Sequence, residues 1–418
     1  MECAMINFSF DNLCCILYYK YTHAYTLYLT FLNMLYVLIV IVGSAFSLKQ
    51  TSKISSVGYK KSASSVVSTH SKPTFLKQSG DVVAAAKKAE PAKASFIDSI
   101  WNENTKLTAY LAVWYLGNIY YNIYNKKACI ALGKNAHGGS NLHWALSAMQ
   151  LFVGVLFVLP MWLTGLRTKP SMTVDNWKEL TPVGLWASLA HAFSVLALGA
   201  GAVSFGQIVK AAEPVFAAAT NAVLLKDIDH PMVYAALIPI IGGVGLASLK
   251  ELSFTWTALI AASLANQAAA FKNVVSKGVM GKPWAKSLGP QNTYAVVNIL
   301  ALLCTLPLVA FFDVKDFSSV LAQVQKMGTV DDVIKYSFFS GLSFYLYNEA
   351  SFLALERLSP VTHSVANTLK RVVIIVASCI VFKTPMSLLG GIGSGIAVAG
   401  TLLYSLAKKS YSKGKGGH

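Results

Sequence analysis

The chain has 418 residues, of which 55% are hydrophobic and only 13% are charged. With a mean hydropathy of +0.52, it carries far less charge than a soluble surface of this size needs, so its excess apolar surface must face lipid. Lys and Arg number 35 against 18 acidic residues, and in a lipid-embedded chain this surplus indicates anionic ligands or targeting rather than nucleic acid. None of the six cysteines forms a CxxC pair, which argues against a disulfide framework or a zinc site.

The N-terminal part of the chain differs in composition from the rest. Residues 27–43 contain no charge and end at Gly43-Ser44-Ala45, a small-residue pattern typical of a signal-peptidase site. The next stretch, up to residue 80, is rich in Ser, Thr and Lys and contains no acid, which is typical of a transit peptide. We therefore expect a signal peptide over residues 1–45, with a retained anchor as the alternative, and a transit peptide with its linker over residues 46–95.

Ten apolar segments follow. Each has about the length that an α-helix needs to cross a hydrocarbon core of ~30 Å, and segments of alternating polarity, which a membrane barrel requires, do not occur. We therefore expect an all-α integral membrane protein with ten transmembrane helices. The expected spans are residues 107–124, 142–163, 181–200, 203–225, 231–247, 254–275, 293–312, 336–355, 360–382 and 386–407.

An internal repeat divides these segments into two halves. Residues 215–226 match residues 372–383 at an offset of 157, and the same offset pairs Gly243 with Gly400. Segments four and five thus match segments nine and ten, and because each half holds five helices, an odd number, the halves must be inverted. This plan is typical of secondary transporters, which bind their substrate at the midplane between the repeats. The expected repeats and a final basic tail are residues 96–250, 251–410 and 411–418.

Several expected spans contain ionisable side chains, which are costly at that depth. Lys370 and Arg371 are adjacent, ten residues into their segment, and no acidic residue lies one helical turn earlier. A bound anion is the simplest source of the missing charge. Phosphate suits both cations, because Arg presents a two-pronged donor and Lys a point charge. Lys210, in the matching segment of the first repeat, would bring a third positive charge to the same phosphate.

For other polar residues in the spans, a structural role is the alternative. Lys210 and Glu213 are spaced i,i+3 and can form an ion pair within one helix. Lys272 lies within a turn of the end of its segment, where its long side chain can reach the membrane interface. His191 and Tyr347 suit the hydroxyl, carbonyl or carboxylate end of a small organic phosphate, but a buried, hydrogen-bonded place in the core explains them equally well.

The sequence lacks the motifs of common enzymes and pumps. No Walker loop, HExxH, GxSxG or acidic metal cluster occurs, which argues against a primary pump or a membrane hydrolase. We expect neither a cofactor nor a bound metal. The glycines of residues 390–395 resemble a dinucleotide-binding loop, but they lie within an expected span and follow no strand, so close helix packing explains them better.

Four segments of the chain resemble the plastid phosphate translocators, which belong to the drug/metabolite transporter superfamily. They are Asn125-Lys126-Lys127, residues 203–214, Tyr347-Asn348 and, most specifically, residues 359–372 with their Lys370-Arg371 pair. The resemblance covers residues 100–408. It implies ten helices in two inverted five-helix repeats, and exchange of inorganic phosphate for a phosphorylated three-, five- or six-carbon compound.

The resemblance also implies roles for individual residues. The positions that match the phosphate-binding cations of the family are Lys210, Lys370 and Arg371. The positions that match its other substrate contacts are His191, Ser194, Lys272 and Tyr347. The chain departs from the family pattern at Gly206-Gln207, where Thr-His is usual, at Ser194, where threonine is usual, and at Lys272, where arginine is common. These departures leave the preferred substrate open.

The leader and the loops together indicate a location. Residues 43–46, Gly-Ser-Ala-Phe, are similar to the Ala-Ser-Ala-Phe junction of bipartite leaders in algae with complex, red-lineage plastids. This resemblance implies the innermost plastid membrane. Loops on the side of the two termini hold more Lys and Arg than the loops opposite, which places both termini in the stroma.

We therefore expect an obligate antiporter, and not an enzyme, that exchanges inorganic phosphate for triose phosphate or 3-phosphoglycerate by alternating access. By resemblance, His191 favours the triose-phosphate branch of the family over the phosphoenolpyruvate branch. The alternatives within transport are phosphoenolpyruvate or a pentose or hexose phosphate as the cargo. A non-transporting membrane scaffold or a membrane enzyme is the alternative of a different class.

Overall fold

The computed structural model describes residues 103–135, 140–249, 254–358, 360–384 and 386–412. The expected signal peptide and transit segment, residues 1–95, lie outside the described residues, as do residues 413–418 of the expected basic tail. Within the described ranges the regular structure is helical, apart from one isolated bridge between Lys134 and Ser140.

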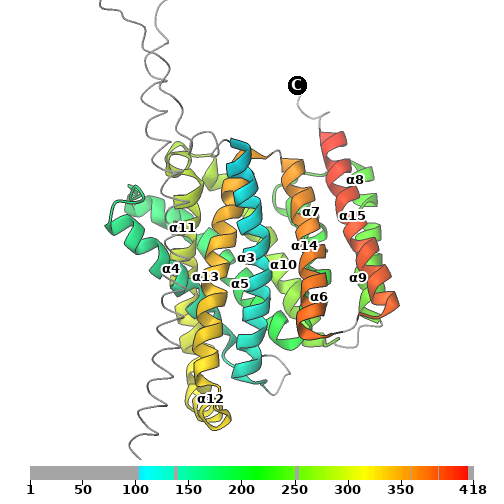
Figure 1. The fold of residues 1–418 in the computed structure, drawn as a ribbon. Helices are drawn as coiled ribbons and strands as arrows, with labels where there is room; N and C mark the ends of the chain where they lie inside the picture. Colours follow the sequence, from blue (N-terminus) through cyan, green and yellow to red (C-terminus); the bar gives the residue numbers. More distant parts are fainter. Residues whose placement is uncertain (1–102, 136–139, 250–253, 359, 385, 413–418) are drawn as a thin grey trace, which may run out of the picture. The chain divides into compact units, whose positions relative to one another are not determined.

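All ten expected segments are helical (Figure 1). The first five form α3 (Glu103–Leu132), α4 (His143–Leu163), α5 (Val174–Ala200), α6 (Val203–Lys210) with α7 (Glu213–Leu224), and α8 (Pro231–Ala235) with α9 (Ile238–Leu249). The second five form α10 (Trp256–Met280), α11 (Pro283–Leu308), α13 (Val330–Arg357), α14 (Pro360–Phe382) and α15 (Leu388–Ser412). The π-helical turn η2 (Val309–Asp313) and α12 (Val314–Met327) lie between α11 and α13.

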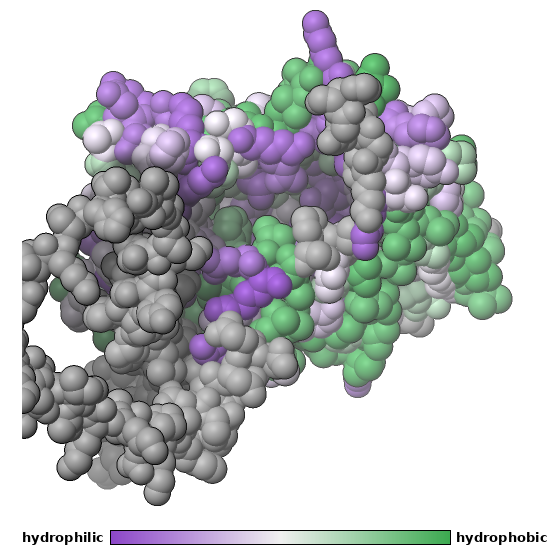
Figure 2. All heavy atoms as spheres, turned by 90° about the horizontal axis from the view of Figure 1, so that it is seen from above, coloured by the Kyte–Doolittle hydropathy of each residue, from purple (hydrophilic) through white to green (hydrophobic). Residues whose placement is uncertain are grey.

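Six of these segments are long and apolar enough to cross a membrane. They are α4, α5, α8 with α9, α11 with its extension through α12, α14 and α15. Figure 2 shows hydrophilic residues gathered on the face seen from above and hydrophobic residues along a flank, as a multi-pass membrane protein requires. The four segments that fall short are α3, α6 with α7, α10 and α13, and all four contribute side chains to the cavity described below.

The fourth segment is not one helix, as the sequence pattern suggests, but two. A turn at Ala211 and Ala212 separates α6 from α7, and Pro214 follows in the first turn of α7, where its missing N–H breaks no helical hydrogen bond. Lys210 is therefore the last residue of α6 and Glu213 the first residue of α7. The alternative of an i,i+3 ion pair within a single helix does not hold for the described structure, because α6 ends between the two residues and Glu213 pairs with Arg371.

The first segment is longer than expected, and its C-terminal part is hydrogen-bonded to the end of α5. It was expected to stop at residue 124, but α3 continues to Leu132 and includes Lys126, which the sequence pattern assigned to a loop. The Lys126 Nζ donates hydrogen bonds to the carbonyl oxygens of Leu198 at 2.8 Å and Gly201 at 2.7 Å. Both carbonyls belong to the C-terminal end of α5, which attracts a cation because its carbonyl groups have no helical partner.

Helix α12 is an element that the search for long apolar segments did not predict. Its apolar residues Phe317, Val320, Leu321 and Val324 follow the i,i+3,i+4,i+7 spacing of an amphipathic helix, and its remaining residues are mostly polar. Val320 and Val324 pack in one cluster with residues of α3, including Leu132. Val320 and Val324 therefore hold the helix against α3, whereas Phe317 and Leu321 of the same stripe are exposed.

Contacts between helices far apart in the sequence define the arrangement. Helix α3 packs along α13, α10 along α5, and α9 along α15. Glycines bring α9 and α15 into backbone contact: a Cβ atom on Gly243 would lie 2.6 Å from the carbonyl oxygen of Gly393, and one on Gly400 would lie 2.8 Å from Ile240 Cγ1. Gly393 belongs to the glycine-rich run of residues 390–395, which lies within α15 and serves helix packing.

We expect Gly243→Ala to lower the melting temperature of the purified protein in detergent, because overpacking a close contact costs about 1–3 kcal/mol. The matched control is Gly242→Ala, since nothing lies within 4 Å of a Cβ atom at Gly242. In that variant the melting temperature should be equal to or above that of the wild type, since alanine favours a helix more than glycine does. Equal melting temperatures for the two variants would contradict the close packing of α9 on α15.

Candidate functional site

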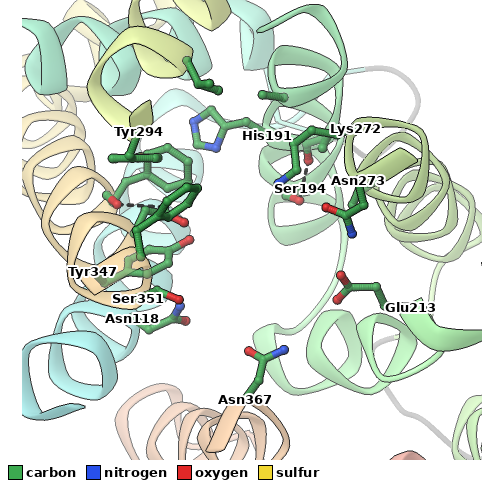
Figure 3. Close-up of a pocket in the computed structure, with 18 of the residues that line it drawn as sticks. Asn118, His191, Ser194, Glu213, Lys272, Asn273, Tyr294, Tyr347, Ser351 and Asn367 are labelled. Atoms are coloured by element: carbon green, nitrogen blue, oxygen red, sulfur yellow. Dashed lines mark hydrogen bonds between the residues drawn. The ribbon is translucent and has the colours of Figure 1, made fainter. Parts of the chain in front are cut away.

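A cavity of about 480 Å³ lies among the helices. Its lining comes from both halves of the chain, with α3, α4, α5, α6 and α7 from the first and α10, α11, α13 and α14 from the second. Figure 3 shows labelled side chains from several of these helices around an open centre, with Tyr347 and Asn118 across from Lys272 and Glu213. The lining includes every residue predicted for the site: His191, Ser194, Lys210, Lys272, Tyr347, Lys370 and Arg371.

Positive charge dominates the lining. Four cations, Lys210, Lys272, Lys370 and Arg371, face the cavity, whereas Glu213 is the acidic residue among the lining side chains. Lys272 belongs to this group and does not behave as an isolated interface residue, since it interacts electrostatically with Glu213. The excess positive charge makes the described cavity a site for an anion.

The break between α6 and α7 positions two of these charges. Lys210 lies at the C-terminal end of α6, where the helix dipole favours a cation, and Glu213 lies at the N-terminal end of α7, where the dipole favours an acid. The sequence therefore places each charge at the helix end that stabilises it. A continuous helix would give neither residue this advantage.

One arm of the Arg371 guanidinium group is paired with an acid, and the other arm has no partner in the described structure. Its Nη2 atom forms an ion pair with Oε2 of Glu213 at 2.7 Å, and its side chain is 8% exposed. Its Nη1 atom is buried and has no hydrogen-bond partner among the described residues. The sequence pattern suggested that a bound anion alone would supply the missing negative charge. Glu213 supplies part of it, because the fold brings this side chain of α7 to Arg371 of α14, and half of the guanidinium group is left for a ligand.

Lys370 lies against aromatic rings and forms no ion pair among the described residues. Its Nζ lies 5.0 Å from the ring centroid of Trp114 and 5.8 Å from that of Tyr347, distances that allow cation–π attraction. The Trp114 ring in turn stacks on His363, with centroids 4.7 Å apart. This aromatic wall, formed by α3, α13 and α14, stabilises the ammonium group without neutralising its charge.

His191 is buried but not hydrogen-bonded. It is 5% exposed, its ring lies against Phe344 with centroids 4.0 Å apart, and neither ring nitrogen has a partner among the described residues. The alternative of a satisfied core histidine is therefore wrong for the described structure, and the unpaired nitrogens suit a ligand. Ser194, one turn further along α5, donates to the carbonyl oxygen of Ala190 at 2.7 Å and keeps its oxygen as an acceptor.

Neutral amide residues make up much of the remaining polar lining. Sequence reasoning did not select them, although Asn118 and Asn122 show the i,i+4 spacing of one helix face. The amide residues of the lining are Asn118, Asn122, Gln207, Asn266, Asn273, Asn298, Asn348 and Asn367. They add donors and acceptors to the cavity without changing its charge.

Glu349 has a structural partner outside the lining residues. Arg167 lies in the loop after α4, but it is 2% exposed and forms an ion pair with Glu349 of α13. Its Nη1 atom also donates to the hydroxyl of Tyr345 at 3.3 Å. Pairing offsets part of the cost of burying these two charges, and the pair ties the loop after α4 to α13.

We expect Glu349→Gln to destabilise the protein by about 3–5 kcal/mol, because the change leaves the buried Arg167 guanidinium without its counter-charge. Thermal unfolding in detergent measures the effect. Glu356→Gln, an exposed position on the same helix, is the control and should melt like the wild type. A melting temperature of Glu349→Gln that equals the control would mean that Arg167 does not depend on Glu349.

Comparison with known proteins identifies the family. Residues 105–405 match the model described as the Triose-phosphate Transporter family. The chain is 36% identical over 305 residues to a non-green plastid triose phosphate/phosphate translocator of Brassica oleracea var. botrytis, covering 73% of each protein. It is 35% identical to phosphoenolpyruvate/phosphate translocator 3 of Oryza sativa subsp. japonica, over 74% of this chain and 77% of the relative. It is also 35% identical to glucose-6-phosphate/phosphate translocator 1 of Arabidopsis thaliana, over 78% and 79%. The chain therefore belongs to the Triose-phosphate Transporter family, a family of transporters and not of enzymes.

Proposed function

We propose that the protein is an obligate antiporter that exchanges inorganic phosphate for triose phosphate or 3-phosphoglycerate. The observation that carries the proposal is the cavity in which four cations face Glu213, with the Nη1 atom of Arg371 unpaired among the described residues. Such a surplus suits a phosphate group, which carries about two negative charges and several acceptor oxygens. The names of the three relatives each pair phosphate with a phosphorylated metabolite, which supports the same class of ligand.

The phosphate group is proposed to bind Lys210, Lys370 and Arg371. The free half of the Arg371 guanidinium can donate to a phosphate oxygen while the other half stays with Glu213. Lys370 forms no ion pair within the described part of the chain, where aromatic rings lie against its ammonium group. Lys210 brings the third charge from the first half of the chain.

The rest of the substrate is proposed to contact His191, Ser194, Lys272 and Tyr347. The unpaired nitrogens of His191 suit a hydroxyl or carbonyl group, and Lys272 suits a carboxylate such as that of 3-phosphoglycerate. Relatives of three different named cargoes are nearly equally similar to this chain. Identity alone therefore does not select the cargo, and phosphoenolpyruvate or a sugar phosphate is the alternative.

We also propose that the ten segments form two inverted repeats that alternate around the cavity. The packing supports this plan. Adding 157 to the residue numbers of α3 leads to α10, and subtracting 157 from those of α13 leads to α5, so the packed pair of α3 and α13 corresponds to the packed pair of α10 and α5. The same exchange maps the contact between Gly243 and Ala397 onto the contact between Gly400 and Ile240. The proposed location is the innermost plastid membrane with both termini in the stroma, and the relatives are named as chloroplastic proteins.

Strict exchange follows from the charge of the empty cavity. Water and counter-ions screen the cations while the cavity is open, but closing it removes that screening. Repulsion between unit charges a few ångströms apart is then on the order of several kcal/mol at an effective dielectric near 20. Glu213 offsets one of the four charges, so most of the repulsion remains. A barrier raised by about 4 kcal/mol slows switching roughly a thousandfold, and a bound phosphate dianion removes most of it.

We expect Arg371→Lys to reduce phosphate–phosphate exchange by about tenfold or more in reconstituted liposomes. Lysine keeps the charge but cannot hold Glu213 and phosphate with two separate arms, and one charge-assisted hydrogen bond contributes about 1.5–3 kcal/mol. Lys277→Ala removes an exposed cation of the same helix as Lys272 and should leave exchange unchanged. Wild-type rates for Arg371→Lys, at matched reconstitution, would remove Arg371 from the proposed site.

We expect uptake of labelled phosphate to be near background in liposomes that contain no phosphate, and to rise steeply when phosphate is loaded inside. The reason is that an empty, positively charged cavity cannot close and return. The same proteoliposomes with and without internal phosphate form the matched pair. Comparable uptake in both would show a uniporter and contradict the proposed charge-dependent coupling.

A further inference from the structure

Three amide side chains form a continuous hydrogen-bonded row in the wall of the cavity. Nε2 of Gln207 in α6 donates to Oδ1 of Asn122 in α3 at 2.9 Å. Nδ2 of Asn122 donates in turn to Oδ1 of Asn118 at 2.8 Å. All three line the cavity, and they are 6%, 2% and 6% exposed, respectively. The row joins a helix that carries a phosphate-site cation to the aromatic wall around Trp114.

A backbone group fixes the direction of every amide in this row. Nδ2 of Asn122 also donates to the backbone carbonyl oxygen of Asn118 at 2.7 Å. A carbonyl oxygen can only accept, so Asn122 must point its nitrogen toward Asn118 and its oxygen toward Gln207. Gln207 must then offer its nitrogen to Asn122, and Asn118 must offer its oxygen. The usual uncertainty between amide oxygen and nitrogen is thereby removed.

The two ends of the row are left for a ligand. Asn122 uses its oxygen and its nitrogen within the row. Oε1 of Gln207 and Nδ2 of Asn118 make no hydrogen bond within the described part of the chain, and both residues line the cavity. An acceptor oxygen that cannot turn away needs a donor. Neither the dianionic phosphate group of an ester nor a carboxylate has one, whereas a hydroxyl group does.

The position of Gln207 relates this acceptor to the proposed phosphate site. Gln207 precedes Lys210 by three residues in α6, which puts them on one face of the helix about 4.5 Å apart along its axis. A hydroxyl on the carbon next to the ester carbon of a phosphate ester lies at a similar distance from phosphorus. We propose that Gln207, held by Asn122 and Asn118, accepts a hydrogen bond from such a hydroxyl and selects hydroxylated phosphate esters as substrates. This inference rests on the proposed exchange function.

The test compares two inhibitors that differ by one hydroxyl group. Liposomes with the purified full-length protein are loaded with phosphate, and uptake of labelled phosphate is inhibited with 3-phosphoglycerate or with 3-phosphopropionate, which lacks the hydroxyl. One hydrogen bond predicts that the wild type needs roughly fivefold to tenfold more 3-phosphopropionate for equal inhibition. Gln207→Met should abolish this difference and keep phosphate–phosphate exchange within about threefold of the wild type. If this variant is not recovered folded, Gln207→Ala removes the same amide without the apolar side chain.

Gln150→Met is the matched control. Gln150 is also a buried glutamine in an amide network, donating to Asn125 Oδ1 at 3.1 Å and Ser340 Oγ at 2.9 Å, but it is not among the lining residues. This variant should keep the hydroxyl preference. Equal inhibition of the wild type by the two compounds, or an unchanged preference in the Gln207 variants, overturns the inference. Loss of phosphate–phosphate exchange in the wild type itself would instead refute the proposed function.

Discussion

The cavity depends on one electrostatic constraint: four cations lie among membrane helices with Glu213 as the acid beside them in the described structure. Unpaired charge away from water is costly, so each cation needs another form of support. Arg371 obtains it from Glu213, Lys370 from aromatic rings, and Lys210 from the C-terminal end of a helix that is interrupted at this point. Among these supports Glu213 offsets one charge, whereas the aromatic rings and the helix end offset none, so positive potential remains available to an anion.

Much of this arrangement could be predicted from the sequence, because a charged residue inside an apolar segment is costly and therefore easy to recognise as a site residue. Lys210, Lys370 and Arg371 stand out for that reason, and all of the predicted site residues line the cavity. The amide row could not be predicted, since neutral asparagines and glutamines disturb an apolar pattern too little. The burial of Arg167 could not be predicted, because arginine is ordinary in a loop, and only the fold shows that this loop folds back onto Glu349. The break after α6 was missed because Ala211 and Ala212 favour a helix.

The distinction between family and cargo has a physical basis. A phosphate group presents the same charge whichever carbon skeleton it carries, so the cations that hold it give no information about the rest of the substrate. Discrimination must come from the other walls, where the polar groups are mostly neutral and directional. His191 and Gln207 are of this kind, since each places an atom without a partner in the described structure at the cavity. Relatives with different named cargoes can therefore share one-third of their residues with this chain.

The glycine contacts between α9 and α15 have a mechanical consequence. Side chains between two helices normally absorb small shifts by changing rotamer, but at Gly243 and Gly393 backbone meets backbone and no such layer exists. Sliding one helix past the other would drive peptide groups into each other. Any movement that opens or closes the cavity is therefore expected to move α9 and α15 together as one rigid unit. The bending that such a movement requires must take place elsewhere, in connecting loops or at the interruption between α6 and α7.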